Sequence, residues 1–316
     1  MELAVLTPQS VQAEIRKTRH KAERPLYIIL SLAGFLTILM YIINASNGTI
    51  FSEFAEMIEE SGMGSGEVDI SYLTQFLIIA LTLMNGIVII IFFIARIIIE
   101  FYRYYGKELA YGVRVSEKNF PEIYEKVKEY TGLLGMKKEP EVFVKQENGT
   151  VNAFTSWVPG RGCYIQLNAE IVDLAYMEHK DFDTIYFVMA HEFGHIYLRH
   201  VQMYYNLFIY FLSFIPIIGP GFLSPMLQRA REYSADRVAQ ALTDGVGQED
   251  CMMLLSAGRH IYRHISSTAY LQDIIAKQGP LTRFSRWLIN AASSHPIAPF
   301  RVKAILDPRK KSGRIF

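Results

Sequence analysis

Cysteine is scarce in this sequence. Only Cys163 and Cys251 occur among 316 residues, far apart and without a CxxC pair, which argues against a disulfide framework and a thiolate zinc site. We expect both to be small core residues. The sequence also lacks an excess of charge of one sign, because 32 basic side chains balance 31 acidic ones. Nothing therefore points to a nucleic-acid partner.

Charged residues are missing from two long segments, Leu26–Ala45 with 20 residues and Tyr72–Ala95 with 24. A membrane-spanning helix needs about 20 apolar residues, because each rises about 1.5 Å through hydrocarbon roughly 30 Å thick. The first segment lacks the cleavage pattern of a signal peptide, and buried core helices rarely run so far without a charge. With 51 % hydrophobic residues and a mean hydropathy of +0.15, the chain is predicted to join a soluble domain to two spans.

Basic residues are missing from the segment between the two spans, 46–71, which carries only acidic charges. Basic residues instead flank the outer ends of the spans: Arg16, Lys17, Arg19, Lys21, Arg24, Arg96, Arg103 and Lys107. Positive flanks stay in the cytoplasm. We therefore expect a two-helix transmembrane hairpin over 26–100 in the cell membrane, with both termini on the cytoplasmic side. The cytosolic segment 1–25 is predicted to contain a helix capped by Thr7, with Pro8 at its first position.

Residues 101–316 have the pattern of an α+β domain. The apolar spacing predicts a helix over 120–134 that ends at Gly135. Three extended pieces follow at 141–145, 151–157 and 163–167, separated by glycine-containing turns. The rest has helical spacing nearly to the C-terminus. We expect a mainly helical domain with a small antiparallel sheet.

The segment HEFGH at 191–195 carries the first sign of chemistry. It lies in a helical stretch that Asp183 can cap. Residues four apart share a helix face, so His191 and His195 can bind one metal ion. Glu192 is then placed to reach a water on that ion without binding the metal. The alternative is a helix whose two histidines only form hydrogen bonds, and the short motif does not decide between them.

A pair of carboxylates follows in REYSADR at 231–237, where Glu232 and Asp236 are again four residues apart. A catalytic zinc site has three protein ligands and an open position, and each histidine ligand usually donates its other ring N–H to an acceptor. We therefore predict one zinc ion per chain, held by His191, His195 and Glu232, with Asp236 as the acceptor behind a histidine. The alternative is that both carboxylates lie on the surface and pair with the neighbouring arginines.

HEFGH, with Glu232 37 residues after its second histidine, resembles the membrane zinc proteases that include HtpX and the CAAX prenyl proteases. Three weaker matches occur in the order of that family. They are the segment Asn152-Ala153-Phe154, His200 five residues after His195, and Ser294-His295-Pro296 with Arg301. The resemblance covers about residues 115–305. It implies a zincin-like metallopeptidase fold and the hydrolysis of peptide bonds.

The resemblance also implies roles for individual residues. Glu192 would be the general base that takes a proton from water and passes it to the leaving amine. His295 would donate to the tetrahedral oxyanion, with an exposed loop histidine as an equal alternative. Asn152, Ala153 and Phe154 would pair with the substrate backbone as an added strand, although core packing explains Phe154 equally well. We expect His200 to be structural, because one helix face already supplies two ligands.

The uncharged segment 201–228 lies between the two zinc-binding stretches. One membrane crossing here would put Glu232 on the wrong side of the bilayer, and two crossings need about 40 residues. We expect a membrane-proximal insertion, a short helical hairpin that dips into the membrane surface or roofs the active site. A buried helix pair within the domain is the alternative.

Together these features predict a membrane-anchored zinc endopeptidase that cleaves membrane or membrane-proximal proteins in quality control. Its expected partners are a protein or peptide substrate and the lipid bilayer. A prenyl-protein protease is the alternative enzyme, although two spans are too few for the intramembrane chamber of that class. A catalytically inactive, zinc-stabilised membrane scaffold or adaptor is the alternative of another class. Glu192 argues against it, because a scaffold has no use for a general base.

Overall fold

The computed structural model describes residues 6–46, 86–178, 180–212, 224–276, 279–307 and 313–314. Helix α1, Pro8–Thr18, begins as predicted, because the Thr7 side chain accepts a hydrogen bond from the Ser10 N–H and Pro8 lies in the first turn. Helix α2, Glu23–Ser46, contains the first predicted span. Residues 47–71 of the predicted external loop and 72–85 of the second predicted span lie outside the described residues. The rest of that span lies in α5, Gly86–Tyr111.

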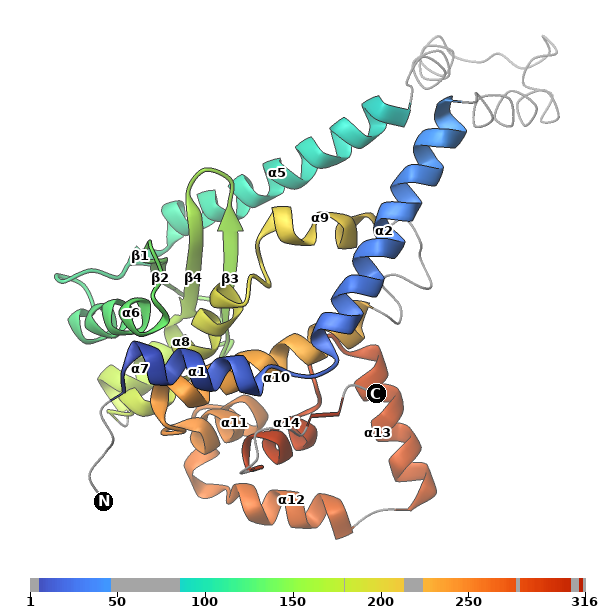
Figure 1. Cartoon of the computed structure of the whole chain (residues 1–316). Coiled ribbons are helices and arrows are strands. Elements are labelled where there is room, and N and C mark those ends of the chain that lie inside the picture. The colour runs from blue at the N-terminus through green and yellow to red at the C-terminus, as the bar shows by residue number, and fades with distance from the viewer. Residues whose placement is uncertain are drawn as a thin grey trace, which may run out of the picture.

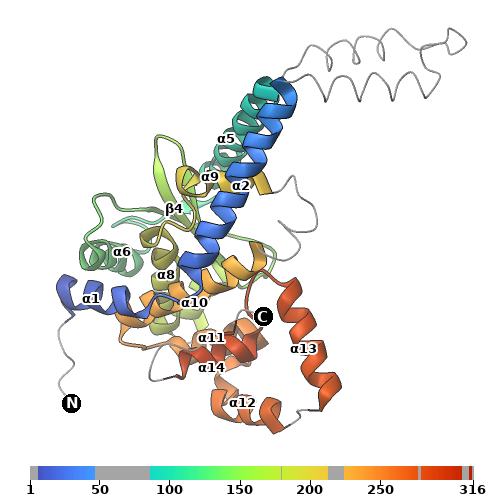
Figure 2. The same ribbon diagram turned by 45° about the vertical axis from the view of Figure 1, so that its right-hand side comes forward.

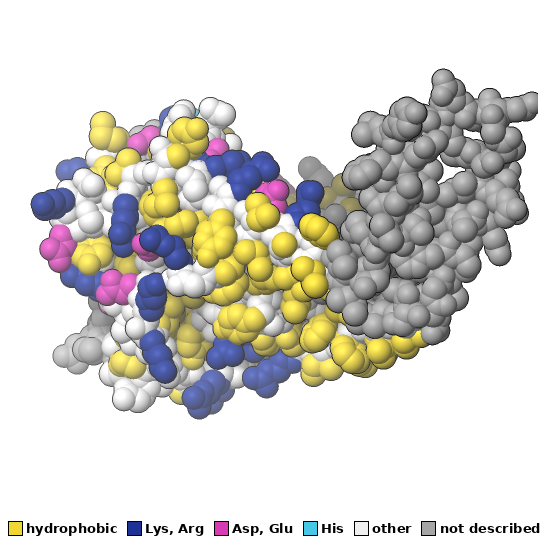
Figure 3. Space-filling view, turned by 90° about the horizontal axis from the view of Figure 1, so that it is seen from above, with side chains coloured by type: hydrophobic (Ala, Val, Ile, Leu, Met, Phe, Trp, Pro, Cys, Tyr) yellow, Lys and Arg dark blue, Asp and Glu magenta, His cyan; other side chains and the backbone are white. Residues whose placement is uncertain are grey.

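Helices α2 and α5 run toward the same end of the molecule, away from the other elements (Figures 1 and 2). Among the described residues, Glu23–Met40 is the one helical stretch long and apolar enough to cross a membrane. From Ile28 onward its exposed side chains are apolar, and those of Ile28 and Met40 are 62 % and 64 % exposed. Seen from above, hydrophobic side chains gather in a broad area bordered by Lys and Arg (Figure 3). One apolar helix is weak evidence of membrane association, and a second span stays a prediction.

The described strands form one four-stranded sheet in the order β1-β2-β4-β3. They are β1 Val113–Arg114, β2 Glu141–Lys145, β3 Ala153–Val158 and β4 Gly162–Asn168. The predicted antiparallel sheet is therefore wrong in one respect. β3 and β4 form an antiparallel hairpin, but β2 pairs with β4 in parallel. Turn signals mark where strands end, whereas strand order depends on which neighbours they pack against in the fold.

Helices cover both faces of the sheet. Helix α6, Pro121–Leu134, ends at Gly135 in the left-handed region as predicted, and packs with α8, Phe182–Tyr197, against one face. That face supplies Val142, Val144, Ile165 and Leu167 to the main core. On the other face Tyr105 of α5 packs against Phe143 and Tyr164. Because both faces are covered, β2 and β4 are buried along most of their length.

The chain after β4 is helical, as expected. The elements are α7 Ala169–Asp173, a π-helical turn Leu174–Glu178, α8, α9 Met203–Phe211, α10 Ser224–Thr243, α11 Gln248–Ala257, a 3-10 turn Tyr262–His264, α12 Ser267–Ala276, α13 Pro280–Ala292 and α14 Ala298–Ile305. Helix α10 packs alongside α8, and α1 packs on α6 and α10 (Figure 1).

The predicted insertion at 201–228 contains α9 and, at 224–228, the first residues of α10, while residues 213–223 lie outside the description. Helix α9 packs on α2, where the rings of Tyr27 and Tyr205 stack with centroids 4.3 Å apart. Its backbone also meets Gly34 so closely that a side chain there would collide with the Phe208 carbonyl. The predicted hairpin in the membrane surface stays a prediction.

Candidate metal centre

Helix α8 carries the HEFGH segment and begins earlier than predicted. Asp181, not Asp183, is its cap, because the Asp181 carboxylate accepts hydrogen bonds from the Thr184 N–H at 3.0 Å and from the Thr184 hydroxyl at 2.7 Å. Asp183 instead lies within the first helical turn. Both residues can act as caps, and the start of the helix decides between them.

Gly194 allows α8 and α10 to approach each other closely. A Cβ atom at this position would lie 3.0 Å from the Ala235 Cα and 3.1 Å from the Val238 Cβ, which is tighter than nine in ten real Cβ contacts. The contact lies one helical turn beyond Glu232 on α10 and next to His195 on α8. The absence of a side chain at Gly194 therefore sets the separation of the helices that carry the three predicted ligands.

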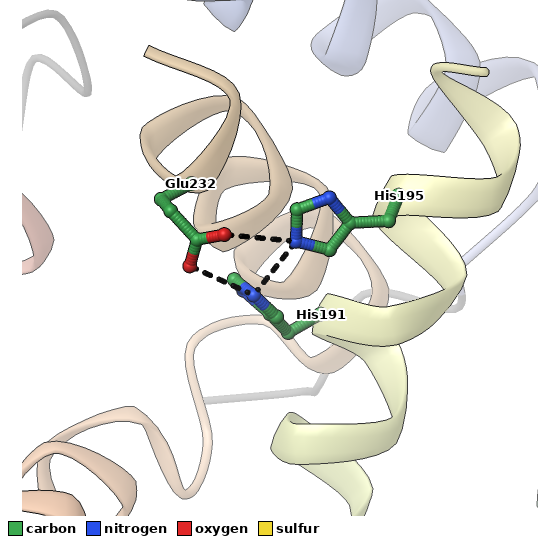
Figure 4. Close-up of side chains that lie close together, drawn as sticks. All are labelled: His191, His195 and Glu232. Atoms are coloured by element: carbon green, nitrogen blue, oxygen red, sulfur yellow. Dashed lines mark hydrogen bonds and ion pairs between the residues drawn. The ribbon is translucent and has the colours of Figure 1, made fainter. Parts of the chain in front are cut away.

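The three predicted ligands meet between these helices (Figure 4). One carboxylate oxygen of Glu232, Oε2, lies 3.4 Å from the His191 Nε2, and the other, Oε1, lies 3.3 Å from the His195 Nε2. The two Nε2 atoms are 3.1 Å apart. Among the described residues, these three form the one group of His, Cys, Asp or Glu side chains whose ligand atoms lie close enough together to hold a metal ion.

The donor set fits zinc. Tetrahedral ligands about 2.0–2.1 Å from zinc lie about 3.3 Å from one another, close to the three measured separations. The Nδ1 atom of His191 lies 2.9 Å from Asp236, and that of His195 lies 2.9 Å from His200. With these Nδ1 atoms donating, both Nε2 lone pairs point toward Glu232 and toward each other. The two Nε2 lone pairs and the Glu232 carboxylate converge on one point, which makes this point a site for a cation.

The pKa shifts of Glu232 and His191 agree with a cation site between these side chains. Burial raises the pKa of Glu232, but hydrogen bonding with His191 and His195 outweighs it and holds the pKa well below its usual range. For His191, burial and Arg301 lower the pKa, while the hydrogen bonds to Asp236 and Glu232 raise it to about 9. A proton and a metal ion therefore compete for the same histidine nitrogen.

Asp236 lies behind His191, and Arg301 of α14 holds it there. The guanidinium donates two hydrogen bonds to the carboxylate, from Nε at 2.8 Å and from Nη2 at 2.7 Å. Burial raises the pKa of Asp236, and Arg301 more than offsets this to give a value of about 2. Glu232 and Asp236 are both buried, so the alternative of two surface carboxylates is wrong. The sequence had given Arg301 no role beyond the resemblance.

A cleft of about 630 Å³ opens onto the three ligands. Glu192 lines it, and burial raises the pKa of its carboxyl group. His295 stands at the cleft with its side chain 67 % exposed and its Nε2 atom 3.7 Å from Glu232. The segment Asn152–Phe154 borders the same cleft. The fold thus brings together all the residues to which the resemblance gives roles.

His200 is not one of the three converging ligands. It lies behind His195, and its other ring nitrogen lies 3.1 Å from Glu23 at the base of α2. The sequence gave no signal for Glu23, because it precedes HEFGH by far and belongs to no motif.

Residues 117–309 match the family model described as Peptidase family M48. No curated protein and no solved structure matches the chain significantly. The match covers both helices that carry the ligands, and it leaves α1, α2 and α5 outside.

Proposed function

The chain belongs to peptidase family M48, and on this premise we propose that it is a membrane-anchored zinc endopeptidase whose active site faces the cytoplasm. The proposal rests above all on the convergence of His191, His195 and Glu232 from two helices. A general base, Glu192, lines the same cleft. The resemblance recognised from HEFGH and REYSAD agrees with the family match.

Zinc bound by His191, His195 and Glu232 would supply Lewis-acid chemistry for the hydrolysis of a peptide bond. Glu192 moves the protons. Burial raises the pKa of Glu192, so its carboxylate is a stronger base than that of an exposed glutamate, which suits it to accept a proton from the attacking water and to return it to the leaving amine. His295 lies beside Glu232 with its ring accessible, so it can donate a hydrogen bond to the developing oxyanion.

Strand β3 is suited to bind the substrate backbone. It is an outer strand of the described sheet, so one of its edges has no strand partner there. Its first residues border the cleft beside α8. An extended peptide can add to such an edge, beside the cleft that Glu192 lines. Phe154 is only partly buried, and it packs edge-on against Tyr164, so packing and substrate contact are compatible roles.

The apolar helix α2 supports a membrane location and, with it, substrates in or near the membrane. Its basic flank favours the cytoplasmic side for the catalytic domain. Tethering keeps the cleft close to the bilayer, so membrane proteins are the proposed substrates and quality control the proposed role.

Glu192→Gln in the full-length protein tests the proposal. The amide keeps the shape but cannot accept the water proton, so we expect stoichiometric zinc and a loss of cleavage of about 10²- to 10⁴-fold. Glu170→Gln is the matched control, because Glu170 is buried but does not line the cleft. Metal analysis and a chelator-sensitive peptidase assay give the readouts. Undiminished cleavage by zinc-loaded Glu192→Gln would refute the mechanism. Equal cleavage of soluble casein and membrane proteins would refute the proposed substrate class.

A further inference from the structure

A continuous chain of hydrogen bonds runs from the metal centre to the base of α2. The Nδ1 atom of His195 lies 2.9 Å from the Nδ1 atom of His200. The Nε2 atom of His200 lies 3.1 Å from Oε1 of Glu23. Glu23 is the first residue of α2, three residues before the predicted span begins. His200 and Glu23 are both buried.

The proton positions along this chain follow from its end points. Zinc bound at the Nε2 atom of His195 leaves the proton on Nδ1, which must then donate to His200. His200 accepts that bond on Nδ1 and therefore carries its own proton on Nε2. That proton is donated to Glu23, because a carboxylate can only accept. One consistent set of neutral tautomers thus connects the metal ligand to the carboxylate.

Glu23 is itself held firmly. Arg19 donates to its Oε1 atom at 2.7 Å, and the Ser234 hydroxyl of α10 donates to Oε2. The same guanidinium donates to the Leu198 carbonyl at the end of α8 at 3.2 Å. The carboxylate is therefore fixed against both helices that carry the ligands.

The two ligand histidines of α8 are thus supported in different ways. Asp236 accepts directly from His191 and is held by Arg301. His195 reaches its carboxylate through an intervening imidazole, His200, and that carboxylate comes from the N-terminal segment. Partners of this kind orient a ligand ring and increase its basicity.

We propose that Glu23 is a positioning residue of the metal centre, acting on His195 through His200. The N-terminal segment, which lies outside the family match, then completes the metal site. The base of the apolar helix and the zinc ligands form one hydrogen-bonded unit. This inference rests on the proposed zinc function of the site.

The experiment measures zinc affinity by chelator competition on the full-length protein. Losing a partner behind a ligand costs 10–100-fold in metal affinity, and Glu23 acts through one further residue, so we expect Glu23→Ala to weaken zinc binding about tenfold. Glu23→Gln keeps an oxygen between Arg19 and His200, so it should recover most of that loss. The visible absorption of the Co²⁺-substituted protein should change in Glu23→Ala, because the ligand field at His195 changes.

His200→Asn separates this role from simple stabilisation. The asparagine oxygen can take the place of Nδ1 and accept from His195, but the side chain cannot extend to Glu23. Zinc affinity should therefore fall in His200→Asn, and adding Glu23→Ala should lower it no further. Asp181→Ala is the control, because Asp181 caps α8 and loss of the cap should reduce stability without changing zinc affinity. If Glu23→Ala fails to fold, His200→Asn alone decides the question.

The outcomes separate the two hypotheses. A wild-type protein that binds no zinc would overturn both the proposed function and this inference. If the wild type binds zinc and cleaves peptides, but zinc affinity is unchanged in Glu23→Ala or in His200→Asn, the inference alone is overturned. An additive loss in the double variant would also overturn it, because Glu23 would then act independently of His200.

Discussion

Gly194→Ala adds one methyl group between α8 and α10. The new Cβ would lie 3.0 Å from the Ala235 Cα, whereas ordinary contact begins at 3.4 Å, a shortfall of 0.4 Å. Two of its three nearest atoms belong to the Ala235 backbone and cannot rotate away. The helices must therefore separate, and the distance between Glu232 and the two histidines must grow with them.

The expected magnitudes follow from this shortfall. Metal–ligand distances tolerate changes of about 0.2 Å, half of the required shift, so we expect zinc affinity to fall at least about tenfold. Overpacking costs about 1–3 kcal/mol, while replacing glycine by alanine in a helix gains about 1 kcal/mol. The metal-free protein should therefore lose about 0–2 kcal/mol in its free energy of unfolding.

Chelator competition and denaturation of the metal-free protein measure these two effects. Gly132→Ala is the matched control, because a Cβ there meets nothing within 4 Å on an exposed helix position. It should gain up to about 1 kcal/mol and keep its zinc affinity. Gly194→Ala with the stability gain of the control and wild-type zinc affinity would refute the claim that this contact sets the ligand spacing.

Two further predictions concern the surroundings of the ligands. Arg301→Lys should weaken zinc binding about tenfold, because lysine cannot donate the paired hydrogen bonds that fix Asp236; chelator competition measures this, and unchanged affinity would contradict it. Asp181→Ala should cost about 1 kcal/mol at pH 7, because it removes the cap of α8. Burial raises the pKa of Asp181, but hydrogen bonds from Tyr262 and Thr184 outweigh this and lower it. Its stabilisation is therefore present above about pH 4 and lost as the pH falls toward the folded pKa, so metal-free Asp181→Ala should lose less stability on acidification than the wild type. The prediction would be contradicted if the melting temperatures of the variant and the wild type fell by the same amount as the pH is lowered.

Much of the local structure could be predicted from the sequence, because its signals lie close together along the chain. Thr7 with Pro8 begins α1, and Gly135 ends α6. The spacing of His191 and His195 fixes their common helix face. The HEFGH motif lies within five residues, so its two histidines can be recognised as candidate metal ligands without tertiary information.

The remaining features depend on contacts between distant residues. The parallel pairing of β2 with β4 and the cap at Asp181 were decided by packing and by the start of α8. The pairing of Arg301 with Asp236 joins residues 65 positions apart.

The sequence by itself determined which residues can bind zinc, since ligand type and helical period are local properties. Only the tertiary structure decided how the ligands are held. The close approach at Gly194 and the chain from His195 through His200 to Glu23 exist because separate helices pack together. A buried hydrogen bond depends on distance in space, and a sequence records only distance along the chain.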